Sequence, residues 1–335
     1  MASRQRRLIG LVSGTLAIAL VATGSVTANA AERPAAKASQ WQDVADQAYA
    51  NAVEDYDSLT SQGKNTWSFY VAAAAHYAGM RFGWSDPRTQ TWLQRVYQRV
   101  TPSGGYGLNF AYDAYGDGTV NPANTTYTIT TGFHVGQVLI DGYDGGGVPA
   151  ARVTAAARAI LDTPQTAGGK CAAYSKHVND SRKPCIWNVT AWGAWFLWRA
   201  SERGLVPAGR ADEALSKLRT WRDYVRAHYS TSLGGWNYQE GGPNVIDDPG
   251  HLSATVQAMY EMDPSIGVPA LTAFWKHYPT SISGSGLILY DCSKAAAAYP
   301  GLRDNALGDL GSAEKNFSLI TLGALMERIA IKCNV

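Results

Sequence analysis

The chain repeats one unit of helix, turn and helix along most of its length. Each unit has an amphipathic helix, a turn rich in glycine and aromatic residues, and an Asn or Asp that opens a more apolar helix. The turns begin about fifty to sixty-six positions apart, a spacing that fits a helical hairpin with its connections. They occupy residues 104–107, 168–171, 234–237 and 284–287. The repeat therefore predicts a fold assembled from helical hairpins.

Two kinds of helix alternate along the chain. The helices before the glycine turns carry charged residues on one face and apolar residues three or four positions apart on the other. We expect them over 88–100, 150–161 and 209–228. The helices after the turns are richer in apolar and small residues, and Asn or Asp is a good N-cap for each because its side-chain oxygen accepts a free backbone N–H. We expect these to begin near Asn65, Asn124, Asn188, Asp248 and Asn316.

This alternation is what an outer and an inner ring of helices would require. No sustained alternation of Val and Ile indicates a larger sheet. We therefore expect an all-α fold with inner and outer helices and short β-hairpins at the glycine-rich turns.

The N-terminal segment has the three parts of an export signal. Three Arg open it, residues 8–22 are apolar, and Ala28 and Ala30 are the small residues of a cleavage site. The apolar stretch is short for a membrane span and has no charged stop behind it, which disfavours the alternative of a retained anchor. We expect a secreted protein with a signal peptide at 1–30, a disordered lead-in at 31–40 and a single domain at 41–335.

Removing the signal changes the charge of the chain. The full sequence has 29 Lys and Arg against 27 Asp and Glu, and the leader carries three Arg and no acid, which leaves 26 basic residues in the mature chain. A nearly neutral chain gives no support to binding of nucleic acid or membranes through net charge. No nucleotide-binding loop or metal-binding helix motif occurs, so we expect no cofactor and no metal.

Four cysteines, Cys171, Cys185, Cys292 and Cys333, lie in the mature part of the chain. An even count in an exported protein predicts two disulfides, for which three pairings are possible. Proximity in the sequence favours Cys171–Cys185 and Cys292–Cys333. A zinc site is the alternative, but no Cys-x-x-Cys or paired-His spacing supports it.

The repeat resembles that of the α/α toroids, the rings of helical hairpins shared by six-hairpin glycosidases, several polysaccharide lyases and terpenoid-cyclase-like proteins. The resemblance extends from about residue 41 to residue 333 and lies in the form of the repeat. It implies a cleft at one end of the barrel, where loops lead into the inner helices. The terpenoid-cyclase pattern pairs Gly-Gly-Trp turns with Asp-x-Asp-Asp. Here Gly234-Gly235-Trp236 is present, but residues 245–248 read Val-Ile-Asp-Asp, which makes isoprenoid cyclisation the weaker alternative.

The densest polar cluster lies between a glycine turn and an apolar helix. It contains Trp236, Tyr238, Asp247, Asp248 and His251. A His in the first turn of a helix, next to carboxylates, can act as a general acid or base. The alternative is that Asp248 caps the helix and His251 is a solvated surface residue.

A second segment runs from Tyr112 through Asp113 to Asn124 and Tyr127. Asp113 could be one half of a carboxylate pair of the kind that glycosidases use, with Asp247 or Asp248 as the other half. Asp117, within Gly-Asp-Gly, is typical of a turn. On the helix that follows, Tyr127 is the better site candidate, and His134 is expected to be a hydrogen-bonded core residue.

The third segment is the loop between Cys171 and Cys185, which contains His177 and Arg182 and leads to Trp187 and Asn188. A basic loop held by a disulfide can bind acidic groups on a sugar. The alternative is a solvated loop that is cross-linked for stability outside the cell.

A surplus of polar-tipped aromatic residues suggests the kind of ligand. The chain has 11 Trp and 18 Tyr but only 7 Phe, a ratio that suits half-wet concave walls better than a dry interior. Elimination from a uronate needs a group that neutralises the carboxylate, a base and an acid. Toroid lyases are similar in using Asn, His and Tyr with a basic residue, and Asn188, His251, Tyr127 or Tyr238, and Arg182 fit those roles.

We therefore expect a secreted enzyme that cleaves glycosidic bonds of a polysaccharide by elimination or hydrolysis, with no nucleic-acid partner and an oligomeric state that the sequence leaves open. The alternatives are a non-catalytic saccharide- or peptide-binding protein and a terpenoid-cyclase-like toroid. The expected catalytic residues are His251, Asp247, Tyr127, Tyr238, Asn188 and Asp113. The expected substrate-binding residues are Trp236, Trp187, Tyr112, Asn124, Arg182 and His177.

Overall fold

Helices dominate the part of the chain that the structure describes, as the alternation of charged and apolar helices predicted. The structure is a computed structural model that describes residues 39–61, 67–282, 284–307 and 313–335. The signal peptide expected at 1–30 lies outside these residues, as does most of the expected lead-in. The helix that follows already begins at Gln40. No described helix has the length and apolar character needed to cross a membrane.

The observed bounds agree closely with those expected for two of the three charged helices. The helices also differ in how much of their surface they bury. Helix α7 buries Ala214, Leu218, Trp221 and Val225, which recur at every third or fourth position, whereas α6 buries most of its residues. The α-helices are α1 (Gln40–Ser61), α2 (Ser68–Phe82), α3 (Pro87–Tyr97), α4 (Val135–Asp144), α5 (Ala150–Leu161), α6 (Trp187–Glu202), α7 (Ala211–Ala227), α8 (Pro249–Met262), α9 (Pro264–His277), α10 (Ala295–Ala306) and α11 (Ala313–Cys333).

Short helices and strands connect these elements. A π-helix, η1 (Thr130–His134), leads into α4, and the strands β1 (Gln165–Thr166) and β2 (Cys171–Ala172) pair antiparallel around the turn at Gly168 and Gly169. The strand pair and isolated bridges beside the turns at Gly104 and Gly234 confirm the expected hairpins. The turn at Gly284 instead opens a 3-10 helix. The 3-10 helices are η2 (Ala167–Gly169), η3 (Val178–Arg182), η4 (Ser285–Tyr290) and η5 (Cys292–Lys294).

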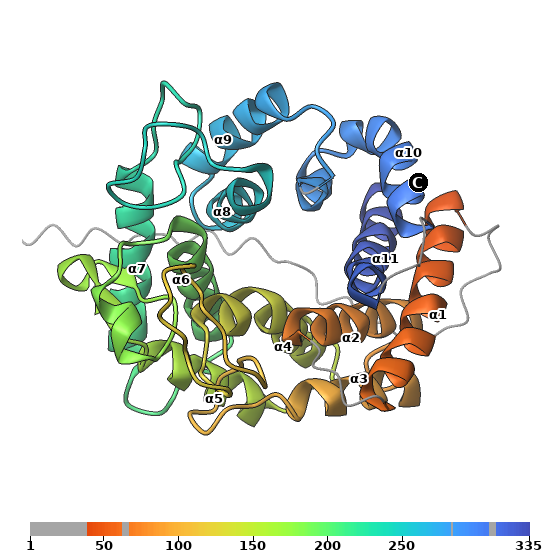
Figure 1. Cartoon of the computed structure of the whole chain (residues 1–335), viewed down its shortest axis with the longest axis horizontal. Coiled ribbons are helices and arrows are strands. Elements are labelled where there is room, and N and C mark those ends of the chain that lie inside the picture. Colours follow the sequence, from red (N-terminus) through yellow and green to blue (C-terminus); the bar gives the residue numbers. More distant parts are fainter. Residues whose placement is uncertain (1–38, 62–66, 283, 308–312) are drawn as a thin grey trace, which may run out of the picture. The chain divides into compact units, whose positions relative to one another are not determined.

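Two sets of contacts connect the helices. Successive helices pack in pairs, α2 with α3, α4 with α5, α6 with α7 and α8 with α9. The second set joins the more apolar helices: α2 contacts α4 and α11, α6 contacts α4 and α8, and η4 contacts α8 and α11. The first and last described helices, α1 and α11, lie side by side (Figure 1). The Gln42 side chain donates a 3.3 Å hydrogen bond to Glu327 between these two helices.

The apolar helices approach one another closely because small residues lie between them. A Cβ atom on Gly132 would come within 2.8 Å of the Trp192 carbonyl oxygen, so the π-helix can contact the backbone of α6 only with glycine at this position. Next to it, the rings of Phe133 and Trp192 stack with their centroids 4.1 Å apart. A π-turn inserts one extra residue into a helix and so changes the direction of the side chains around it. His134 is the last residue of this turn.

The expected helix starts are partly confirmed. Asp248 is the N-cap of α8 and accepts hydrogen bonds from the backbone N–H groups of Gly250 and His251. Asn188 is not a cap, because α6 begins one residue earlier and its N-cap is Ile186. The expectation for Asn124 was wrong, since this residue has a φ of 64° in a turn several residues before the helix. Asn tolerates this left-handed backbone and so serves the turn.

Both disulfides join the expected partners. Cys171 pairs with Cys185, with Cα atoms 5.7 Å apart, and Cys292 pairs with Cys333, with Cα atoms 5.5 Å apart. The first closes the loop between β2 and α6. The second connects the end of α11 to η5.

Replacing both cysteines of either pair with serine is expected to lower the free energy of unfolding by about 2–4 kcal/mol. The sequence separation is 41 for Cys292–Cys333 and 14 for Cys171–Cys185. Opening the longer loop gives the unfolded chain a greater gain in entropy. Loss of Cys292–Cys333 is therefore expected to lower the free energy of unfolding by about 1 kcal/mol more than loss of Cys171–Cys185. Urea unfolding of both double variants, followed by tryptophan fluorescence, measures the difference. A greater loss for the shorter loop would contradict this expectation.

Candidate functional site

Four of the predicted polar residues gather at the start of α8, and we call Tyr238, Asp247, Asp248 and His251 the rim cluster. The Asp248 carboxylate accepts from the backbone at the helix start and also bonds Nδ1 of His251. The rings of Tyr238 and His251 meet edge to face, 4.8 Å apart. The His251 side chain is 46 % exposed, so its other nitrogen can reach a ligand. The structure thus combines the two roles weighed for this segment: Asp248 caps the helix and also orients His251.

The two neighbouring carboxyl groups of the rim cluster have opposite electrostatic environments. Burial raises the pKa of Asp247 to about 6, with Asp248 adding to the increase and His251 opposing it. For Asp248, partial burial acts to raise the pKa, but the hydrogen bonds from His251 and from the backbone N–H groups hold it below its usual value. Adjacent acids whose pKa values are moved apart in this way can take different roles in acid–base chemistry.

The rim cluster also satisfies the spacing of a metal site. One ligand atom from each of Asp247, Asp248 and His251 lies within 4.8 Å of the others. The Asp248 carboxylate already accepts three hydrogen bonds, two from backbone N–H groups and one from His251. These contacts account for the positions of Asp248 and His251 without a metal ion.

A wall of tyrosine rings lies near the rim cluster. Tyr127 packs against Tyr112 at 6.1 Å and against Tyr174 at 5.9 Å, and Tyr174 packs against Tyr115 at 5.6 Å. Tyr112 is close enough to Tyr238 to contribute to the increase in its pKa to about 12, although burial is the larger cause. Burial likewise raises the pKa of Tyr127 to about 12. Tyr112 and Tyr127 lie in the same connection, between α3 and η1, and Tyr238 lies in the connection between α7 and α8. Tyr127 is only 2 % exposed, so its predicted role in catalysis is not supported.

Other predicted site residues have structural roles. The Trp187 and Trp236 side chains are only 2 % and 1 % exposed, and their indole N–H groups donate to Asn237 and to the Val225 carbonyl. Their rings belong to the core, so the expectation that they contact a substrate was wrong. Asn188 is also buried, and its side chain accepts from the N–H of Val189.

Asp113 stabilises its own loop. Its carboxylate accepts from the backbone N–H groups of Tyr115, Asp117 and Gly118. Desolvation acts to raise the pKa of Asp113, but these donors hold it below its usual value. An acid that is fully engaged by a turn is poorly placed for catalysis, so the predicted pairing of Asp113 with Asp247 is not supported.

Only some of the basic side chains in the loop between Cys171 and Cys185 are exposed. Arg182 is exposed at the end of η3, and His177 is half-buried with no hydrogen-bond partner for Nδ1 among the described residues. Asn124 is exposed in its turn. These three residues remain untested as substrate contacts, and none of them lines the cavity described next.

A central cavity of about 490 Å³ opens beside the rim cluster. Gly250, in the same helical turn as His251, lines it, as do residues from α2, α4, η4 and α11. Its walls include the aromatic side chains Phe69, Tyr70 and Phe133. Its polar lining includes His76, His134, Gln137, Ser253, Gln257, Ser285, Asn305 and Arg328.

His134 had been expected to be a hydrogen-bonded core residue, and that expectation was wrong. It lines the cavity, its ring lies 5.1 Å from Phe69 and 4.5 Å from Phe133, and no hydrogen bond to its ring nitrogens occurs among the described residues. Burial lowers the pKa of His134 to about 4, so the imidazole is neutral near neutral pH. The π-turn that ends at this residue gave no signal in the sequence.

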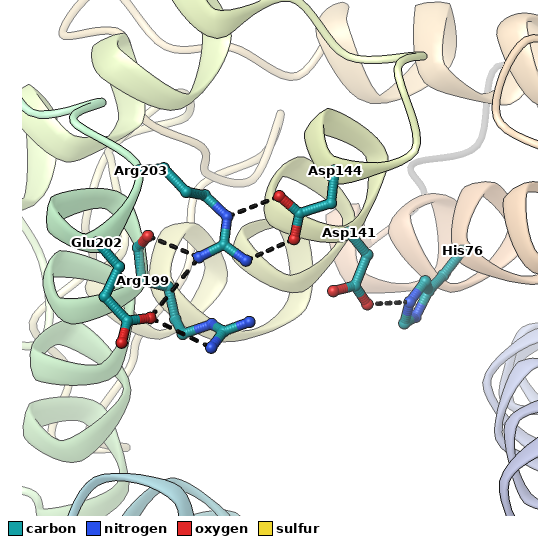
Figure 2. Close-up of polar contacts among 6 residues, drawn as sticks. All are labelled: His76, Asp141, Asp144, Arg199, Glu202 and Arg203. Atoms are coloured by element: carbon teal, nitrogen blue, oxygen red, sulfur yellow. Dashed lines mark hydrogen bonds and ion pairs between the residues drawn. The ribbon is translucent and has the colours of Figure 1, made fainter. Parts of the chain in front are cut away.

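His76 and Arg328 also line the cavity, and neither is among the site residues expected from the sequence. Nε2 of His76 lies 2.8 Å from Oδ2 of Asp141, a pair that Figure 2 shows beside the separate Asp144–Arg203 ion pair. Burial and Arg328 lower the pKa of His76 against the opposing effect of Asp141. Desolvation acts to raise the pKa of Asp141, but the hydrogen bond with His76 holds it below its usual value. A neutral imidazole thus donates to an ionised carboxylate.

No protein-family model matches this sequence, and no curated protein matches it either. Function must therefore be inferred from the chemistry of the rim cluster and the central cavity.

Replacing Asp247 with Asn tests the raised pKa of this buried acid. A carboxyl whose pKa is higher in the folded state stabilises the protein below its unfolded pKa, and this contribution is lost as the pH rises through about 6. The stability of Asp247→Asn relative to the wild type is therefore expected to increase between about pH 4 and pH 7, as measured by urea unfolding at both pH values.

Asp113→Asn is the matched control, because the pKa of Asp113 is shifted in the opposite direction. Asp113 stabilises the fold above its unfolded pKa, so the relative stability of this variant is expected to decrease over the same pH range. Parallel trends in the two variants would refute the contrast between the two carboxyl groups.

Proposed function

We propose that the protein is an extracellular enzyme that cleaves glycosidic bonds of a polysaccharide at the rim cluster. The observation that carries this proposal is the pair of adjacent acids, Asp247 with a raised pKa and Asp248 with a lowered pKa, next to an accessible His251. Cleavage of a glycosidic bond needs one group that protonates the leaving oxygen and another that removes a proton.

Each group in the rim cluster suits one of these steps. Asp247 is the proposed general acid, because burial keeps its proton to a higher pH than is usual for an aspartate. His251 is the proposed general base, with Asp248 fixing its orientation through Nδ1. In hydrolysis, His251 would activate a water molecule. In elimination, it would remove the proton next to the sugar carboxylate, and Asp247 would protonate the leaving oxygen in both cases.

The packing of the helices supports an α/α-toroid architecture for this proposal. Contacts run from α2 to α4, α6, α8, η4 and α11 and return to α2, while α3 packs against α2, α5 against α4 and α6, α7 against α6 and α8, and α9 against α8. A closed series of inner helices with partners outside it is the arrangement expected of a toroid. The cavity lined by α2, α4, α8, η4 and α11 is consistent with a site at its centre.

Two disulfides among the described residues support an extracellular location, because disulfides persist in oxidising environments. The partly exposed rings of Tyr112, Tyr115 and Tyr174 support a saccharide ligand, since aromatic rings with polar tips suit half-wet binding surfaces.

Incubation with a panel of uronic and neutral polysaccharides tests the activity. Ultraviolet absorbance from an unsaturated product would identify elimination, and new reducing ends without that absorbance would identify hydrolysis. Saccharide binding without turnover across the panel would favour the non-catalytic alternative. Absence of both binding and turnover would overturn the proposal for these substrates.

On a polysaccharide that is turned over, Asp247→Asn and His251→Ala are each expected to lower kcat by about 10²–10⁴-fold, the usual contribution of a positioned acid or base. Binding of the same substrate should persist, because neither change removes the cavity walls. The exposed Asp304 and His277 offer matched controls, and Asp304→Asn and His277→Ala are expected to retain full turnover. Equal kcat values for all four variants would rule out the proposed roles.

A further inference from the structure

The described lining of the central cavity includes one charged side chain, Arg328. Arg328 is the only residue of the described lining that carries a full charge near neutral pH, since no Asp, Glu or Lys lines the cavity and burial lowers the pKa of both histidines. The rest of the lining consists of aromatic, small, aliphatic and neutral polar side chains. The described lining of the cavity therefore presents one positive charge and no acid.

Arg328 makes a single hydrogen bond to a side chain in the described part of the protein. Its Nη1 donates to Oε1 of Gln137 at 3.1 Å, and no described carboxylate lies within ion-pair distance. Within the described residues, the other nitrogens of the guanidinium have no side-chain partner. A partly buried cation with a neutral partner loses hydration without the gain of an ion pair, which favours binding of an anion.

The nearby carboxylates are engaged elsewhere. Asp141 accepts from His76, and Glu261 accepts from Trp195 at 2.6 Å and from the Tyr290 hydroxyl. Asp141 and Glu261 line a second cavity of about 320 Å³, which also contacts Arg328. His76 and Arg328 line the central cavity, so the pairs His76–Asp141 and Gln137–Arg328 form a polar layer between the two cavities.

We propose that Arg328 binds the carboxylate of an acidic sugar residue that enters the central cavity, with Gln137 holding the guanidinium in place. Arginine presents a planar fork of N–H donors that matches a carboxylate in geometry. Phe69, Tyr70 and Phe133 provide apolar faces for the sugar ring. The ring nitrogens of His134, which have no hydrogen bond to the described part of the chain, can bond its hydroxyl groups. This inference rests on the proposed function only in choosing a saccharide as the ligand.

Binding of monosaccharides to the unmodified protein tests the inference. Isothermal titration calorimetry with D-glucuronate and D-glucose compares ligands that differ by a carboxylate in place of a hydroxymethyl group. Glucuronate is expected to bind about tenfold more tightly or better, as a charge-assisted hydrogen bond would provide, and its affinity should fall with added salt. Glucose 6-sulfate separates recognition of a carboxylate from recognition of any anion. Equal affinities for glucuronate and glucose, or a preference for the sulfate over the carboxylate, would overturn the proposal.

Variants of Arg328 identify the residue responsible. Arg328→Gln is expected to remove the preference for glucuronate over glucose, whereas Arg328→Lys should keep part of it because the charge remains. Arg303→Gln is the matched control, since Arg303 is exposed on α10 and pairs with Asp304. It should bind like the wild type. If Arg328→Gln does not fold, as judged by circular dichroism, the comparison of Arg328→Lys with the wild type decides, and an unchanged preference in a folded Arg328 variant would refute the assignment.

The result is independent of catalysis, because a monosaccharide has no glycosidic bond to cleave. Preferential binding of glucuronate without turnover of any polysaccharide would leave the anion site standing while the proposed activity failed. Turnover of a neutral polysaccharide without a preference for glucuronate would leave the proposed activity standing while the anion site failed.

Discussion

Close packing of apolar helices through small residues is the constraint on which the rest of the structure depends. At Gly132 the π-turn lies against the backbone of α6, and the adjacent Phe133 stacks on Trp192. Contacts of this kind place α2, α4, α6 and α8 in fixed relation to one another. The helix faces that meet supply the packing energy. The polar cavity between the helices can therefore stay open without loss of the fold. The residues that line the cavity are therefore held by the helices rather than by loops.

The chemistry of the rim cluster follows from its position at the start of α8. The free N–H groups of a helix start stabilise a carboxylate, and Asp248 receives this benefit directly. Asp247, one residue earlier, lies in a buried position, and its backbone is held by Trp236 and Tyr278. Asp248 is thus solvated and hydrogen-bonded, whereas its neighbour Asp247 is desolvated. The start of the helix accounts for the low pKa of Asp248, and tertiary packing around Asp247 accounts for its high pKa.

The sequence predicted local features well and spatial ones less well. The bounds of α5, the cap at Asp248 and both disulfides depend on neighbouring residues or on short spacings, and all are confirmed. The burial of Trp187 and Trp236 could not be read from composition, because an aromatic residue near a glycine turn suits a core as well as a binding wall. His76, His134 and Arg328 come from three different helices, and only the tertiary packing brings them to one cavity. The π-turn at His134 changes the phase of the helix, so an analysis based on regular helical spacing misplaces that side chain.

The pairing of α1 with α11 has a consequence for how the chain reaches its native state. These helices are separated by most of the sequence, yet α11 packs against both α1 and α2. Their interface cannot form during synthesis until the last helix has left the ribosome, and contacts between such distant segments slow folding because a long loop must close first. The core that α1, α2 and α11 share is therefore completed only after α11 has been synthesised.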